Sequence, residues 1–239
     1  MNIGSLLRPR NFKINTKGIG YIRPDKTINF ETPEFAQMYA KNVIVRALNE
    51  SQPYEKGVFI NGSTIVKEVN GSINEININT TGLHFDTMAH GHPDLMGKGK
   101  TSPHSADDIV ALFQNTPNGA TRSIVYNSLG EYAIIEKLPI SKSYNQLPPN
   151  IRKSFLEIKD RKELAAAYRI LDNINKIAME KLQELRVSGK IKKFAKDIPT
   201  ENFFENLINK LNIYVMDEIL RNKSSELNIT YKTNFSNLK

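Results

Sequence analysis

The spacing of apolar residues predicts a helix followed by antiparallel strands in the first part of the chain. Thr32 begins a stretch with a proline and an acid in its first turn, which is typical of a helix start. Apolar residues then recur at helical spacing and predict a helix to about Leu48. Residues 57–79 are rich in β-branched side chains and contain Asn70-Gly71, a pair typical of a tight hairpin. We expect an antiparallel meander there.

The pattern then predicts another strand, a helix and a strand pair. FDTMAH, residues 85–90, reads as a short strand. Ser105 begins SADDIVALFQ, a helix with a capping hydroxyl and acids in its first turn. Residues 121–137 hold two apolar runs around an SLG turn and predict a hairpin. The expected fold class is therefore α/β, with a mixed, largely antiparallel sheet flanked by helices.

The C-terminal part is expected to be a helical extension. Residues 138–150 hold three prolines and several polar residues and predict a linker. An apolar stripe that begins at Leu164 and ends before Gly189 predicts one helix, and Thr200 begins another. From about Lys223 the chain is expected to be weakly ordered.

These elements divide the chain into three parts. Residues 1–31 read as an irregular segment with a possible short strand at GIGYI. Residues 32–140 form the predicted α/β domain, and residues 151–239 form the helical extension. The formal charge is +8, and the basic surplus lies mainly in this extension. Nucleic acid or an acidic partner would suit such a charge, but acids alternate with the bases, which favours a solvated helical face.

Composition limits the chemistry that the chain can carry. Of the 239 residues, 39% are hydrophobic and 24% are charged, as in ordinary soluble globular proteins. There are no cysteines, so a metal must be held by histidines and carboxylates. No apolar stretch is long enough to span a membrane, and the first residues show no secretory signal, so we expect a cytoplasmic protein without a membrane span.

All four histidines lie in one short window, and two of them form the motif HGHPD. His90 and His92 are two residues apart at the end of an expected strand, so they point to the same face. Zinc binds neutral imidazole nitrogens and carboxylate oxygens, and a catalytic zinc keeps one position for water. We expect His90 and His92 to be metal ligands and treat His84 and His104 as bystanders.

The following helix supplies candidates for the rest of the site. Ser105 and Asp108 are three residues apart at the helix start and share a face. Asp108 can complete the ligand set when this helix packs against the strand end, and Ser105 then faces the same cavity. A metal-bound water also needs a base to take its proton. Glu55, which opens the first expected strand, is our candidate.

Together these residues resemble the JAMM/MPN (JAB-domain) zinc metalloprotease family. The family motif is a Glu just ahead of a Gly-apolar strand, then His-x-His-Pro, then Ser-x-x-Asp at a helix start. Here the three elements are Glu55 in EKGVFING, HGHP at 90–93 and SADD at 105–108. The resemblance covers about residues 32–137, and it implies a JAMM/MPN-like fold for that part only.

The resemblance also implies an activity. His90, His92 and Asp108 would bind Zn²⁺, Glu55 would be the general acid/base, and Ser105 would help to hold the oxyanion. The family hydrolyses amide or isopeptide bonds in protein or peptide substrates, including ubiquitin-like ones, and some bacterial and phage relatives process other proteins. Other members have lost the metal, so an inactive interaction protein that binds a protein or nucleic acid through its basic helices is the alternative.

Several assignments stay open on the sequence alone. Glu55 stands one residue closer to its glycine than in the commonest pattern, so Glu50, Glu68 and Glu75 are alternative bases. Asp107 is a rival ligand from the helix start.

Other known patterns also bear on this part of the chain. HGHPD also fits the start of the metallo-β-lactamase ligand run, although Leu95 stands where the next histidine is needed, and plain His-x-His pairs occur in phosphoesterases and cupins. MGKGK, residues 96–100, lacks the full phosphate-loop pattern and reads as a flexible basic lip that could meet an acidic substrate.

Overall fold

One mixed sheet of eight strands runs through the computed structural model of this chain, which describes residues 20–22, 27–72, 76, 80–140 and 145–238. The strand order is β1-β2-β4-β3-β5-β6-β7-β8. Strands β5 and β6 pair in parallel and the other neighbours are antiparallel. The strands are β1 (Gly20–Ile22), β2 (Ile28–Phe30), β3 (Lys56–Asn61), β4 (Thr64–Asn70), β5 (Thr87–Gly91), β6 (Arg122–Tyr126), β7 (Tyr132–Lys137) and β8 (Ile229–Thr233).

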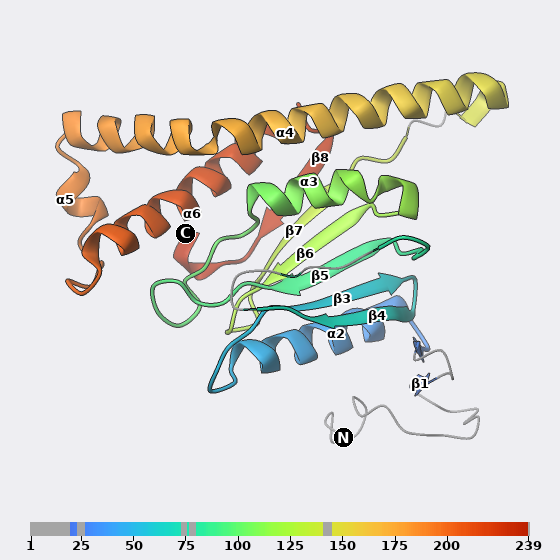
Figure 1. The fold of residues 1–239 in the computed structure, drawn as a ribbon, viewed down its shortest axis with the longest axis horizontal. Coiled ribbons are helices and arrows are strands. Elements are labelled where there is room, and N and C mark those ends of the chain that lie inside the picture. The colour runs from blue at the N-terminus through green and yellow to red at the C-terminus, as the bar shows by residue number, and fades with distance from the viewer. Residues whose placement is uncertain (1–19, 23–26, 73–75, 77–79, 141–144, 239) are drawn as a thin grey trace.

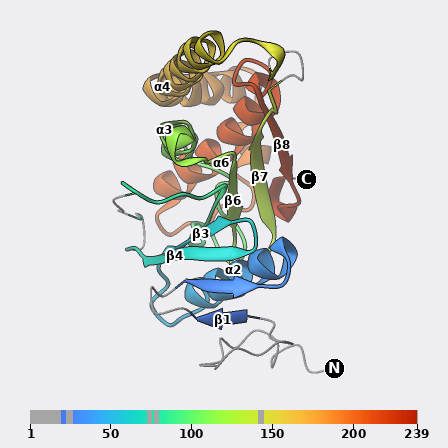
Figure 2. The same cartoon turned by 90° about the vertical axis from the view of Figure 1, so that its right-hand side faces the viewer.

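Helices cover both faces of this sheet (Figure 1). Helix α2 lies on one face, whereas α3 and, beyond it, α4 and α6 lie on the other. Figure 2 shows the same layers from the side, with α4 outermost. The helices are α2 (Pro33–Leu48), α3 (Ala106–Gln114), α4 (Pro149–Val187), α5 (Ile191–Phe194) and α6 (Phe203–Lys223), with short 3-10 helices η1 (Thr116–Asn118) and η3 (Ser236–Leu238). The predicted α/β class, with a mostly antiparallel sheet, is confirmed.

Alternation along β3 explains the two cores. Val58 and Ile60 face α2, while Phe59 between them faces α3 and the C-terminal helices. The parallel pair β5 and β6 follows from the α3 connection, because a crossover helix returns the chain in the same direction. The predicted cap at Thr32 is also present, since its side chain accepts a hydrogen bond from the Phe35 N–H at 3.4 Å.

The C-terminal residues complete the same sheet and the same core. Strand β8 pairs antiparallel with β7 over five residue pairs. Leu211 and Leu220 of α6 are fully buried in the core that also contains Phe59. The prediction of weak order after Lys223 is therefore wrong. The unpaired edge of β7 supplies hydrogen bonds to β8, and burial of Ile229 holds the strand in register.

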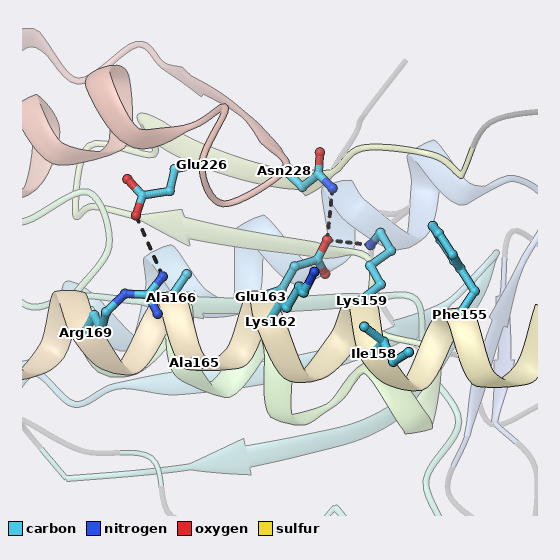
Figure 3. Close-up of a pocket in the computed structure, with 10 residues that line it drawn as sticks. All are labelled: Phe155, Ile158, Lys159, Lys162, Glu163, Ala165, Ala166, Arg169, Glu226 and Asn228. Atoms are coloured by element: carbon cyan, nitrogen blue, oxygen red, sulfur yellow. Dashed lines mark hydrogen bonds and ion pairs between the residues drawn. The ribbon is translucent and has the colours of Figure 1, made fainter.

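A buried ion cluster joins the sheet to α4. Glu163 of α4 is 5% exposed and accepts a hydrogen bond from the Asn228 side chain at 3.2 Å. The Lys159 Nζ lies 2.5 Å from one Glu163 oxygen, and the Lys137 Nζ of β7 lies 3.7 Å from the other. Figure 3 shows Glu163 between Lys159 and Asn228. The helix is thus fixed to the sheet by charge as well as by apolar packing.

Two predictions concern residues outside the described part. The expected strand at residues 72–79 falls mostly on them, and so does most of the irregular segment 1–31, of which β1 and β2 are described.

Among the described residues, no helix has both the length and the apolar character needed to cross a membrane.

Candidate metal centre

Three side chains that the sequence singles out meet at one point. The Nε2 atoms of His90 and His92 lie 3.1 Å apart. Asp108 places Oδ1 3.0 Å from the His90 Nε2 and Oδ2 3.2 Å from the His92 Nε2. One ligand atom from each residue lies within 4.8 Å of the other two. This group can hold a metal ion, because such short separations suit donors that share one cation.

The end of β5 positions the two histidines. His90 is in the strand and His92 follows its last residue, Gly91, so both imidazoles point to the same side. The intervening position faces α2. A Cβ on Gly91 would come 2.7 Å from Ile44 and 2.9 Å from Leu48. Close packing of β5 on α2 therefore explains why a glycine separates the ligands.

The start of α3 positions the third ligand through a capping box. The Asp108 N–H donates to the Ser105 Oγ at 3.1 Å, and the Ser105 N–H donates to the Asp108 Oδ2 at 2.7 Å. The expected shared face of these two residues is thus present. The cap fixes the Asp108 rotamer while Oδ1 remains directed at His90.

A backbone carbonyl orients His92. The Nδ1 of His92 lies 3.1 Å from the Ser102 oxygen, which only a protonated Nδ1 can satisfy as donor. Nε2 is then the nitrogen that a metal ion would bind, as in most ligating histidines. Sequence reasoning missed Ser102, because a main-chain carbonyl leaves no signal in the residue type.

Two of the ligands, His92 and Asp108, have strongly shifted pKa values without a metal ion. Burial acts to lower the pKa of His92, but the Asp108 carboxylate, and more weakly Glu55, raise it to about 9. Burial acts to raise the pKa of Asp108, yet His90 and His92 hold it well below its usual range. The centre therefore favours positive charge, which a metal ion supplies when it displaces the imidazole protons.

A cavity of about 1080 Å³ opens onto this centre. Glu55 and Ser105 line it together with the three ligands. Glu55 stands just before β3, where its backbone pairs with Ser72: its N–H donates to the Ser72 oxygen at 2.8 Å. The cavity therefore brings Glu55 and Ser105 to the metal group, as the sequence predicts.

The alternative acids are placed differently. Glu68 accepts a hydrogen bond from the Tyr39 hydroxyl at 2.7 Å and pairs with Lys56 at 2.9 Å, and it does not line the cavity. Glu50 is exposed and also lies outside the lining, and Glu75 lies outside the described residues. Asp107 lines the cavity but is not one of the three converging ligands. Among the described acids, Glu55 is thus the best-placed base.

The two remaining histidines are not part of the ligand group. His84 is exposed. His104 is fully buried, and its ring centroid lies 6.5 Å from that of His90. Neither ring nitrogen of His104 has a hydrogen bond of normal geometry. The Ser123 backbone lies close enough to raise the pKa of His104 weakly. Burial lowers the pKa of His104 to about 3, so the ring is neutral at physiological pH.

The predicted basic lip is held away from the cavity. The Gly99 N–H donates to the Ser128 Oγ at 3.2 Å, and the Asn127 side chain donates to the Gly99 oxygen at 3.0 Å. Neither Lys98 nor Lys100 lines the cavity. The loop is held at Gly99 by the β6–β7 turn, and a contact of its lysines with an acidic substrate stays a prediction.

Comparisons with known proteins show no family for this chain. No protein-family model, no curated protein and no solved structure matches this chain. The resemblance to the JAMM/MPN family therefore depends on the motif residues and their arrangement alone.

Proposed function

We propose that this protein is a zinc-dependent peptidase or isopeptidase of the JAMM type, acting on an amide bond in a protein or peptide substrate. One observation carries the proposal: His90, His92 and Asp108 converge within 4.8 Å, and Glu55 and Ser105 line the cavity beside them. Two imidazoles and one carboxylate suit zinc and leave a fourth position for water. Bound there, zinc would lower the pKa of that water and polarise the substrate carbonyl.

Three residues beside the metal ligands would have separate roles in the reaction. Glu55 takes the proton of the attacking water and returns it to the leaving amine. Ser105 accepts a hydrogen bond from the Asp108 N–H, so its own hydroxyl hydrogen can be donated to the developing oxyanion. Ser102 holds the His92 ring in the tautomer that presents Nε2.

Metal content and hydrolysis test this proposal together. Elemental mass spectrometry of the purified chain should find about one zinc per chain, and His92→Ala should lose it. Glu55→Gln should retain the zinc and hydrolyse ubiquitin-linked and unfolded protein substrates at least a hundredfold more slowly than the wild type. Zinc retained at full occupancy by His92→Ala would contradict the proposal.

The charges of the C-terminal helices give only partial support to the alternative of an interaction protein. Some exposed bases pair with neighbouring acids, as in Lys181 with Glu218 at 2.9 Å and Lys223 with Glu226 at 2.9 Å. Salt-sensitive binding of a nucleic acid to the whole chain, with no zinc in any preparation, would favour that alternative instead.

A further inference from the structure

Apart from the two histidines of the metal centre, the charged side chains that line the cavity are all acids among the described residues. Lys and Arg account for 33 of the 239 residues, yet none of them lines it. The acids in the lining are Glu55, Asp107 and Asp108. Residues 73–75 and 77–79, which are not described, contain no Lys or Arg in the sequence. A chain with a formal charge of +8 thus places no Lys or Arg among the described residues that line this cavity.

Asp107 is the acid that the proposed chemistry leaves unused. Asp108 is a metal ligand, and Glu55 is the base. Asp107 is exposed and makes no hydrogen bond or ion pair with any residue in the described part of the chain. A divalent ion at the centre would be offset by Asp108 and Glu55, so the charge of Asp107 would remain available to a ligand.

An acid in the first turn of a helix also has a structural explanation, because it interacts favourably with the helix dipole. Glu34 stands in the same turn of α2, where there is no metal centre. Helix α3 already has a complete capping box from Ser105 and Asp108. A substitution at Asp107 that keeps this box therefore separates recognition from helix stability.

Resting on the proposed function, we propose that Asp107 is a specificity residue that selects substrates with a Lys or Arg side chain close to the scissile bond. Asp107 is adjacent to the ligand Asp108, so its carboxylate lies within about 10 Å of the metal position. An extended peptide advances about 3.3 Å per residue. The selected side chain then stands within about three residues of the bond that is cut.

Binding of two matched peptides tests the inference without requiring turnover. The probes are fluorescein-labelled nonapeptides of Gly and Ser that differ only in a central Lys or Glu, titrated with zinc-loaded Glu55→Gln protein at low salt. Fluorescence anisotropy should show the Lys peptide binding about fivefold more tightly than the Glu peptide. Adding Asp107→Asn should remove that difference, whereas Asp172→Asn, a change of an exposed acid on α4, should preserve it.

Equal binding of both peptides, or a Lys preference that survives Asp107→Asn, would overturn the inference. Zinc content, measured in the same samples, separates the two ideas. A chain that holds zinc and hydrolyses protein but shows no charge preference refutes the role of Asp107 alone. A chain that prefers the Lys peptide through Asp107 but binds no zinc refutes the proposed function.

Discussion

Two of the buried clusters of charged side chains differ in the kind of residue that forms them: one pairs a carboxylate with lysines, and the other gathers metal-ligand side chains. Under α4, the Glu163 carboxylate lies between Lys159 and Lys137 and also accepts a hydrogen bond from Asn228. Every charge there has an opposite charge from the chain. The effect of this cluster is to fasten α4 to the sheet, and Glu163, Lys159 and Asn228 also line a cavity of about 460 Å³.

The metal centre is made of different residues. Its donors are His90, His92 and Asp108, side chains that are 10–17% exposed and whose reacting atoms lie 3.0–3.2 Å apart. The raised pKa of His92 lets its ring carry the proton that pairs it with Asp108, and a metal ion can replace that proton at the same point. The comparison teaches that burial of charge is no sign of function in itself. A cluster whose side chains are all metal ligands and converge on one point is the stronger candidate.

Zinc should give the largest stability change, and only through the metal centre. At a thousandfold excess over Kd, zinc should stabilise the fold by about 4 kcal/mol, which raises Tm by about 10 °C. His92→Ala should abolish this rise, because one of three ligands is missing. Differential scanning fluorimetry with and without a chelator measures it. An equal rise in His92→Ala would place the zinc elsewhere.

Removing the Glu163 carboxylate should change the free energy of unfolding slightly less than zinc binding does. Glu163→Ala leaves Lys137 and Lys159 buried without their partner, which should destabilise the fold by about 3 kcal/mol. Denaturant unfolding of the zinc-free protein measures the loss. Glu157→Ala, at an exposed acid of the same helix, should change stability by less than about 0.5 kcal/mol. Zinc stoichiometry should be the same in both variants.

The two clusters also differ in how far the sequence predicts them. Metal binding restricts residue type and spacing, so His90, His92 and Asp108 are recognisable from the amino-acid sequence alone. The Glu163 cluster joins residues 26 and 65 positions apart from it along the chain, Lys137 and Asn228, and no periodic pattern marks such a contact. Local signals similarly predict the capped helices and most central strands.

Pairing across long sequence distances accounts for the main error in the predicted fold. Strand β8 is short, follows a helix, and is stable because β7 offers it an open edge. The contribution of Ser102 to the metal centre was missed for a related reason, since it acts through its main chain. Contacts that depend on tertiary structure alone were therefore the ones that the sequence did not predict.

Buried His104 should make the fold sensitive to acid beside the metal centre. Its pKa is about 3 in the folded chain and near 6.5 when unfolded, so the unfolded state binds more protons between these values. Stability from this group is complete above pH 6.5 and falls as the pH drops towards 3. In chelator, wild type should lose about 2 kcal/mol more than His104→Phe between pH 7 and pH 5. Parallel losses in denaturant unfolding would show that another group is responsible.

Ser105→Ala should give the smallest stability change and shows what holds Asp108 in place. The variant removes the hydroxyl that accepts from the Asp108 N–H, which should cost about 1 kcal/mol, as should Thr32→Ala at the start of α2. Zinc stoichiometry should stay unchanged in both, because neither residue is a ligand. Zinc affinity should fall in Ser105→Ala alone, because the capping box also fixes the Asp108 rotamer. Isothermal titration with zinc measures this, and equal affinities in the two variants would mean that the ligands orient Asp108 without the cap.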